Sequence, residues 1–159
     1  MKAGKTRSIG VSNTPMPMLV DLIAGCEIRP AVNQIEVHPY LQQHAIFEWH
    51  KKYDVAITGY AVIGGGLKLV KTQVMDNPVI KEIAAKHGKT EAQVCMSWLL
   101  GRGGIVLAKT KTESRLTQNM DSFRFQLDEE DYEKIKPLET GARMNNPVEH
   151  ERYGFFPYW

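Results

Sequence analysis

The 159-residue sequence lacks most features of secreted, membrane and nucleic-acid-binding proteins. Its two cysteines, Cys26 and Cys95, belong to no disulfide framework and to no metal-ligand spacing. Its longest apolar runs fall far short of the roughly 20 residues that a membrane helix needs. A formal net charge of +2 is too small to indicate nucleic acid or an anionic membrane as a partner. We therefore expect a cytoplasmic protein with no bound metal, in which both cysteines are small buried hydrophobic residues.

The remaining composition is that of an ordinary globular domain. Hydrophobic residues make up 43% and charged residues 24% of the chain, which is long enough to bury one core. We expect one domain over residues 1–159. Its last part, residues 141–159, is rich in Asn, Pro and aromatic residues and is predicted to be irregular.

Short apolar strands alternate with helical segments along the chain. The strands are predicted at 8–11, 31–37, 55–62 and 105–108. The helices are predicted at 13–25, 42–52, 77–87, 90–100, 113–120 and 128–138, with start signals such as Asn77 before Pro78 and the capping-box spacing of Thr90 and Gln93. This order predicts βαβ units with a parallel sheet. Composition and periodicity leave open whether the sheet is doubly wound or part of a barrel.

Polar or aromatic residues stand at the carboxyl end of each predicted strand. Ser12, Asn13 and Gln34 offer hydroxyl and amide groups that can hold a carboxamide. Tyr60 offers a flat face on which an aromatic ring can stack. Because the carboxyl ends of parallel strands share one rim, these groups predict a ligand site there.

Two cations flank the predicted start of the helix at 113–120. Lys109 and Arg115, with the amide groups of that helix end, suit a phosphate monoester. On spacing alone, a second interpretation is that Thr110 and Glu113 form a capping box and that this region is only a well-capped helix.

Other polar residues have structural interpretations. Ser12, Asn13 and Thr14 are also typical of a helix cap. His38 is interpreted as a structural, hydrogen-bonded histidine, and His44, His50 and His87 as surface residues. The tail aromatics Phe155, Phe156 and Trp159 are compatible with lining a substrate pocket and equally with packing on the outside.

Three segments together resemble the second half of an aldo-keto reductase. They are Ser8-Ile9-Gly10-Val11-Ser12-Asn13, Asn33-Gln34-Ile35-Glu36-Val37-His38-Pro39-Tyr40-Leu41, and Val106-Leu107-Ala108-Lys109-Thr110 followed by Arg115 and Asn119. The resemblance runs from about Gly4 to about Pro147. It implies a (β/α)8 TIM barrel, of which this chain is the C-terminal half with about four parallel strands. Residues 40–43 and 141–147 look most like the aldose and xylose reductase branch.

The resemblance implies NADPH as the cofactor and gives roles at its nicotinamide end. The matches to Ser12, Asn13 and Gln34 hold the nicotinamide carboxamide in the family, and the match to Tyr60 stacks on the nicotinamide ring. The sequence departs from the family pattern beside these residues, with Thr14 in place of an aromatic residue and Ala61-Val62-Ile63 in place of Ser-Pro-Leu.

At the adenosine end the resemblance implies a second group of contacts. The matches to Lys109, Thr110 and Arg115 bind the 2′-phosphate of NADPH, and the match to Asn119, with Gln118, meets the adenine. The presence of both cations favours NADPH over NADH.

The catalytic Asp, Tyr, Lys and His of the family lie in the first half of its barrel, and nothing in this sequence aligns with them. The resemblance therefore implies a reductase of aldehydes, ketones or sugars, of which this chain alone holds the cofactor and is inactive. Four strands of eight leave open sheet edges at 8–11 and 105–108, so we expect as partner either the missing N-terminal half or a second copy. An alternative function is a non-catalytic NADPH-binding module with a regulatory or structural role on the same scaffold.

Overall fold

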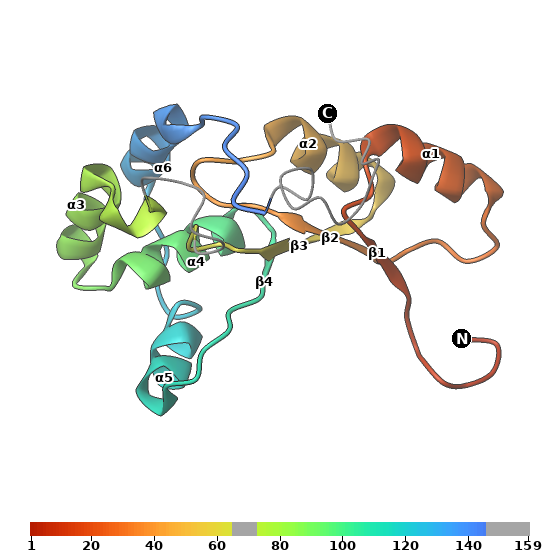
Figure 1. The fold of residues 1–159 in the computed structure, drawn as a ribbon, viewed down its shortest axis with the longest axis horizontal. Coiled ribbons are helices and arrows are strands. Elements are labelled where there is room, and N and C mark those ends of the chain that lie inside the picture. Colours follow the sequence, from red (N-terminus) through yellow and green to blue (C-terminus); the bar gives the residue numbers. More distant parts are fainter. Residues whose placement is uncertain (65–72, 146–159) are drawn as a thin grey trace. The chain divides into compact units, whose positions relative to one another are not determined.

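The computed structural model describes residues 1–64 and 73–145 (Figure 1). The tail residues Phe155, Phe156 and Trp159, and the irregular tail predicted beyond residue 145, lie outside the described residues. The elements, in chain order, are β1 (Gly10–Ser12), α1 (Met16–Gly25), β2 (Val32–Glu36), α2 (His44–Tyr53), β3 (Ala56–Tyr60), the 3-10 helix η1 (Val74–Asp76), α3 (Pro78–His87), α4 (Glu91–Gly101), β4 (Ile105–Val106), α5 (Glu113–Asp121), α6 (Glu129–Ile135) and the 3-10 helix η2 (Lys136–Leu138).

The strands follow one another in a four-stranded sheet of order β1-β2-β3-β4. β1 and β2 are parallel, with Gly10 opposite Val32 and Ser12 opposite Gln34. The predicted alternation of strands and helices is therefore confirmed. In the described residues the chain divides into two compact units, the first made of residues 1–35 and 43–58 and the second of residues 36–42, 59–64 and 73–145. Each unit is described by itself below.

Several element boundaries differ from the predicted ones. β1 begins at Gly10 rather than at residue 8, and β4 ends at Val106 rather than at residue 108. The last predicted helix is also shorter, because α6 ends at Ile135 and continues as the 3-10 turn η2. Pro137 lies inside that turn and has no N–H to donate, which prevents the α-helical pattern from continuing.

The first unit contains α1, α2, β1 and most of β2. Leu19 and Ile35 are buried hydrophobic residues of this unit, whereas Met18 and Leu22 on α1 stay about half exposed. The interpretation of His50 as a surface residue is wrong, because its side chain is 1% exposed. Its ring bonds inward, to the Ile46 carbonyl of its own helix and to the buried Asn33 side chain of β2.

The second unit is built around α4, in which Val94, Trp98 and Leu99 are buried. Within this unit α3 packs against α4, and α6 packs against α3 (Figure 1). The helix also approaches the end of β3 closely, since a Cβ atom at Gly59 would lie 2.4 Å from a methyl group of Leu99. A larger residue at position 59 would therefore require the Leu99 side chain to shift.

The cysteines differ from each other. Cys95 is fully buried in α4, and burial raises the pKa of its thiol to about 12. It therefore behaves as a small hydrophobic residue, as predicted. Cys26, just after α1, is only partly buried.

No helix among the residues that the structure describes is long and apolar enough to cross a membrane.

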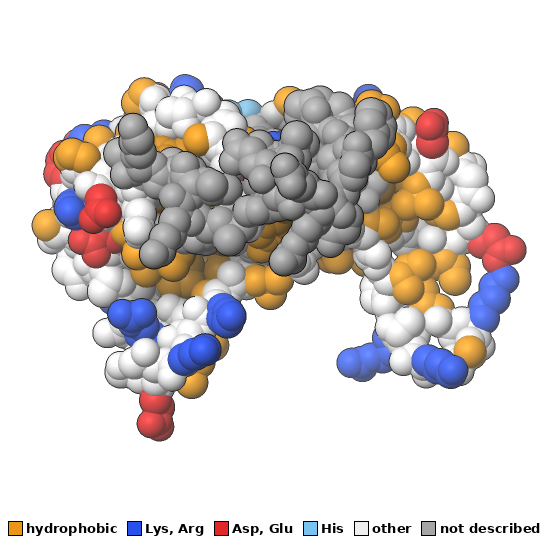
Figure 2. All heavy atoms as spheres, viewed as in Figure 1, with side chains coloured by type: hydrophobic (Ala, Val, Ile, Leu, Met, Phe, Trp, Pro, Cys, Tyr) orange, Lys and Arg blue, Asp and Glu red, His pale blue; other side chains and the backbone are white. Residues whose placement is uncertain are grey.

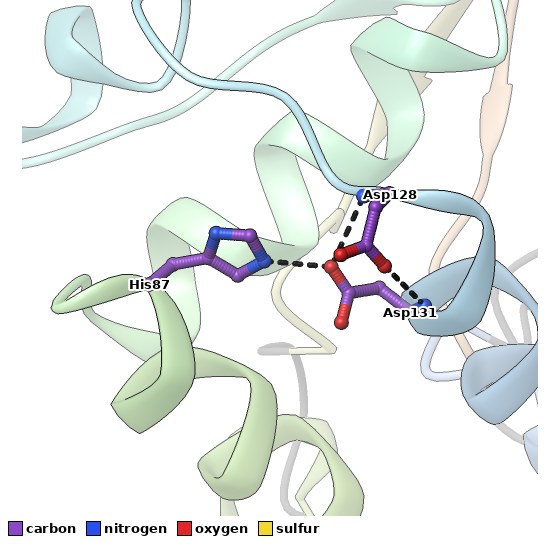
Figure 3. A group of neighbouring side chains, drawn as sticks. All are labelled: His87, Asp128 and Asp131. Carbon is purple, nitrogen blue, oxygen red and sulfur yellow. Dashed lines mark hydrogen bonds and ion pairs between the residues drawn. The ribbon is translucent and has the colours of Figure 1, made fainter.

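A buried carboxylate joins α3 to α6. Asp131 is fully buried, and its oxygens accept hydrogen bonds from His87 Nε2 at 2.6 Å and from the Asp128 N–H at 3.1 Å (Figure 3). Lys86 donates a further hydrogen bond to Asp131 at 2.9 Å. In return, Asp128 accepts from the Asp131 N–H at 3.0 Å, which closes a capping box at the start of α6. Burial by itself would raise the pKa of Asp131, but the hydrogen bonds from Lys86 and His87 outweigh it and lower the pKa.

We expect Asp131→Asn to lower the free energy of unfolding by about 1–3 kcal/mol at neutral pH, since it leaves the Lys86 and His87 donors without a charged acceptor. A carboxylate with a lowered pKa in the folded state stabilises at pH above its unfolded pKa and loses that effect as the pH falls. The wild-type chain should therefore lose stability more steeply than the variant below about pH 4. Urea unfolding at several pH values measures both effects.

Glu129→Gln is the matched control, because it removes one negative charge from an exposed position in the same helical turn. Equal losses in the two variants would contradict the role of Asp131 as the link between α3 and α6.

Candidate cofactor site

The second unit contains a cavity of about 830 Å3 at the carboxyl ends of β3 and β4. Its volume falls in the usual range of small-molecule and cofactor sites. Its lining includes every predicted site residue that belongs to this unit, namely Tyr60, Lys109, Thr110, Arg115, Gln118 and Asn119. These residues are up to 59 positions apart in the sequence (Tyr60 to Asn119), so their shared cavity is produced by the fold.

Tyr60 is the last residue of β3 and forms one wall of the cavity. Its carbonyl accepts a hydrogen bond from the Val37 N–H at 3.2 Å, which fixes the end of the strand. The chain then turns through Ala61, whose φ of 54° is in the left-handed region, and the Gly64 N–H donates to the Ala61 carbonyl at 2.7 Å. This turn leaves the half-buried tyrosine ring beside the cavity.

The other wall is the segment that leads from β4 into α5. The Leu107 N–H donates to the Gly59 carbonyl at 3.2 Å, after which the chain leaves the sheet. Lys109, Lys111 and Arg115 are exposed here, and Figure 2 shows Lys and Arg side chains gathered over this part of the surface. The positive charge is therefore concentrated at the beginning of α5.

Thr110 does not cap α5, and the capping-box interpretation of Thr110 and Glu113 is wrong. The helix begins at Glu113 after Thr112, and within the described chain no side chain caps its first amide groups. The Thr110 hydroxyl instead accepts from the Thr112 N–H at 3.0 Å and lies 3.4 Å from the Thr112 carbonyl, within a local turn. Uncapped amides at a helix N-terminus between two cations suit an anion, although Glu113 in the same turn partly offsets the positive charge.

A buried glutamine holds α5 against α4. The Gln93 side chain is 5% exposed and donates to the Gln118 carbonyl at 2.9 Å, while its oxygen accepts from the Thr90 N–H at 2.9 Å. Gln118 and Asn119 thereby face the cavity beside the start of α4.

The sequence did not reveal part of this lining. Met75, Thr90, Glu91, Ala92 and Met96 also line the cavity. The capping-box pattern accounts fully for Thr90 and its neighbours as a helix start, so no local signal marked them as residues that face a ligand.

The first unit holds the other three predicted residues together. Ser12 and Gln34 are register partners at the carboxyl ends of β1 and β2. The Ser12 hydroxyl and the Asn13 N–H both donate to the Gln34 carbonyl, at 3.0 and 2.9 Å. Asn13 has a φ of 50°, a left-handed conformation that asparagine tolerates better than most residues. The helix-cap interpretation of Ser12, Asn13 and Thr14 is wrong, since α1 begins at Met16 after Pro15 and its N-cap makes no side-chain hydrogen bond.

His38 is a structural residue, as predicted. It is fully buried, and its Nε2 lies 3.1 Å from Glu36, which is also fully buried. The Glu36 carboxylate also accepts from the N–H groups of Met144 and Asn145. This pair therefore anchors the segment before residue 146 within the second unit.

A cluster of His87, Asp128 and Asp131 has ligand atoms close enough to hold a metal ion (Figure 3). The Lys86 ammonium group, however, already donates to Asp128 at 2.7 Å and to Asp131 at 2.9 Å. A dication at this place would be repelled by that ammonium group, so the cluster is a helix-joining network.

Comparisons with known proteins agree on one family. The family model described as "Aldo/keto reductase family" matches residues 1–140. The chain is 41% identical to an NAD(P)H-dependent D-xylose reductase of Scheffersomyces stipitis, over 98% of this chain and 52% of that protein. It is 40% identical to aldose reductase B of Dictyostelium discoideum, over 91% of this chain and 45% of that protein.

A solved structure has the same fold. The crystal structure of a silkworm aldo-keto reductase (AKR2E5) complexed with NADPH superposes with a TM-score of 0.87 and 34% identity, covering 99% of this chain and 50% of that one. The chain thus spans about half the length of the relatives that it matches. Its strands and helices correspond to part of a TIM barrel, which confirms the predicted fold class. This chain belongs to the aldo/keto reductase family.

Proposed function

We propose that this chain is the cofactor-binding half of an NADPH-dependent reductase of aldehydes, ketones or sugars. The observation that carries the proposal is the cavity in the second unit, whose lining holds all six adenosine-end and ring-stacking residues that the sequence nominates there. Relatives named as NAD(P)H-dependent D-xylose reductases and a relative solved with NADPH support the same cofactor class.

Lys109, Thr110 and Arg115 would hold the 2′-phosphate. The two side-chain cations and the uncapped amides of α5 supply positive charge and donors, and the guanidinium group can pair with two phosphate oxygens. Gln118 and Asn119, one turn further along α5, would contact the adenine.

Tyr60 would stack on the nicotinamide ring, and Ser12, Asn13 and Gln34 would hold its carboxamide. Bound NADPH would supply a hydride to the carbonyl carbon of the substrate. The chain's own residues bind and orient the ring, and none of them is assigned as a proton donor. We propose that catalysis by this chain alone is negligible, because a positioned general acid typically contributes 10²–10⁴-fold to the rate.

We expect Arg115→Ala to weaken NADPH binding by roughly 10- to 150-fold, the effect of about 1.5–3 kcal/mol for hydrogen bonds to a charged group. NADH lacks the 2′-phosphate, so its weaker binding should hardly change. Titration of intrinsic fluorescence with each nucleotide measures both affinities.

Arg124→Ala is the matched control for that experiment. Arg124 is an exposed arginine soon after α5 that pairs with Asp121 and does not line the cavity. An Arg115→Ala variant that binds NADPH as tightly as the Arg124→Ala variant would overturn the phosphate role.

We also expect the isolated chain to self-associate. β1 and β4 are the outer strands of the four-stranded order, so each has one edge with no strand paired to it among the described residues. Such edges favour pairing with another chain. Size-exclusion chromatography with light scattering should show dimers or larger species, and a monomer that melts cooperatively would contradict the expectation.

NADPH consumption with D-xylose or a small aromatic aldehyde should be at background level in the same preparation. The cofactor-binding half alone is expected to bind NADPH at most weakly, whereas tight NADPH binding by a stable oligomer without turnover would favour the second candidate, a non-catalytic NADPH-binding module. Turnover by the chain alone would contradict both.

A further inference from the structure

A line of buried polar groups runs through the first unit from α2 to the turn after β1. Its members are His50 on α2, Asn33 on β2 and Thr14 in the turn. Asn33 and His50 are 0% and 1% exposed. None of the three is assigned to a contact with NADPH, so their arrangement requires a separate explanation.

The hydrogen bonds of His50 determine its tautomer. Nδ1 lies 2.8 Å from the Ile46 carbonyl, which can only accept, so Nδ1 carries the hydrogen. In the neutral ring Nε2 is then an acceptor. It lies 3.2 Å from Nδ2 of Asn33, which therefore donates to it.

The Asn33 side chain holds the turn at two points. Its Nδ2 donates a second hydrogen to the Thr14 carbonyl at 2.8 Å, and its Oδ1 faces the Thr14 N–H at 3.4 Å. The next residue of β2 is Gln34, whose carbonyl accepts hydrogen bonds from the Ser12 hydroxyl and the Asn13 N–H. Two consecutive residues of β2, Asn33 and Gln34, thus hold the turn of residues 12–14 by hydrogen bonds.

Protonation of His50 reverses this arrangement. With a hydrogen on Nε2, the ring becomes a donor and faces the Asn33 NH2 group, which is also a donor. The amide can relieve this only by turning Oδ1 toward the ring, which places NH2 against the Thr14 N–H and oxygen against the Thr14 carbonyl. Both bonds to Thr14 are then lost, because each pairs two donors or two acceptors.

Among the described residues, burial and one backbone hydrogen bond are the influences found on the ring, and no charged side chain is found that would compensate for its protonation. Burial lowers the pKa of His50, and the Ile46 carbonyl partly opposes that effect. The Trp49 ring lies edge-on to the imidazole at 5.3 Å. On α2, Lys51, Lys52 and the terminal Asp54 are exposed, and Arg29 donates to the Tyr53 carbonyl at the helix end. β1 has no charged residue, and on β2 the residue that shares the face of Asn33 is Ile35.

We propose that His50 is a positioning residue that holds the turn of residues 12–14 through the Asn33 amide and releases the turn when the imidazole is protonated. The link between ring and turn stands on the geometry of the first unit. Its consequence for the cofactor, a weaker hold on the nicotinamide carboxamide in acid, rests on the role proposed above for Ser12 and Asn13.

The sign of the effect follows from the direction of the pKa shift. A histidine whose pKa is lowered in the folded state destabilises the fold as the pH falls below its unfolded value of about 6.5, because the unfolded chain binds the proton first. The turn should therefore be held firmly at pH 7.5 and loosen only as the pH falls below about 6.5.

The test is an NMR titration of the full chain between pH 7.5 and 5, following the His50 ring and the backbone amides of residues 12–14. We expect the ring to show a neutral Nδ1–H tautomer at pH 7.5, and the turn amides to shift with the midpoint of the His50 ring. In His50→Gln, whose side chain offers an acceptor but does not titrate, the turn amides should stay constant. His44→Gln, which removes an exposed histidine of the same helix, should leave the wild-type titration unchanged.

Turn amides that do not move with the His50 ring, or that titrate equally in His50→Gln, would overturn the proposal. If His50→Gln fails to fold, the wild-type and His44→Gln titrations alone decide, because the shared midpoint is measured in them.

A second arm measures binding of NADP⁺, which tolerates acid, at pH 7.5 and 5.5. Its phosphate titrates equally in all variants, so only the difference between wild type and His50→Gln is informative. We expect an additional acid loss of roughly 2- to 12-fold in the wild type, the range for one neutral hydrogen bond. If the turn amides follow His50 but this difference is absent, the positioning stands and the carboxamide role of the turn fails.

Discussion

The parallel register between β1 and β2 is the constraint on which the proposed nicotinamide end of the site depends. It places Ser12 opposite Gln34, so the Gln34 carbonyl accepts hydrogen bonds from both the Ser12 hydroxyl and the Asn13 N–H. A slip of one residue would turn every side chain of β1 to the other face of the sheet. The pairing of the two backbones therefore determines which side chains lie where we place the carboxamide.

In the second unit, one buried side chain has the comparable role. Gln93 closes the capping box of α4 with its oxygen and holds the Gln118 carbonyl with its nitrogen. The start of one helix and the position of the next are thereby coupled. Because Arg115 and Asn119 lie on that second helix, α5, the placement of the residues that we assign to the adenosine end depends on a side chain to which we assign no contact with the cofactor.

The features predicted correctly from the sequence are those whose cause is local. Asn77 caps α3, Gly88 ends it in the left-handed conformation, and Thr90 closes a box with Gln93, all within four residues of the signal. The order of the strands along the chain could also be predicted, because the family motifs fall at the strand ends.

The sequence could not show that His50 is buried, since its partner Asn33 lies 17 positions away and α2 carries polar residues on several sides. The link between Lys86 and Asp131 spans 45 positions and was missed for the same reason. The alternative interpretation of Thr110 as a helix cap failed because a correct capping spacing does not require the helix to begin at the expected residue.

Burial of Asn33 explains why a titratable ring stands behind the turn. A fully buried carboxamide is tolerated only when its donors and acceptor are paired, and Thr14 satisfies just one of the two hydrogens on Nδ2. An aliphatic side chain at position 50 could fill the space but would leave the other hydrogen unpaired. An acceptor is therefore needed, and a neutral imidazole fixed by its own helix supplies one at little entropic cost, because Ile46 already orients the ring. The acceptor that best completes the buried network is thus also a group that protonation converts into a donor, so the sensitivity to pH follows from the requirement to satisfy Asn33.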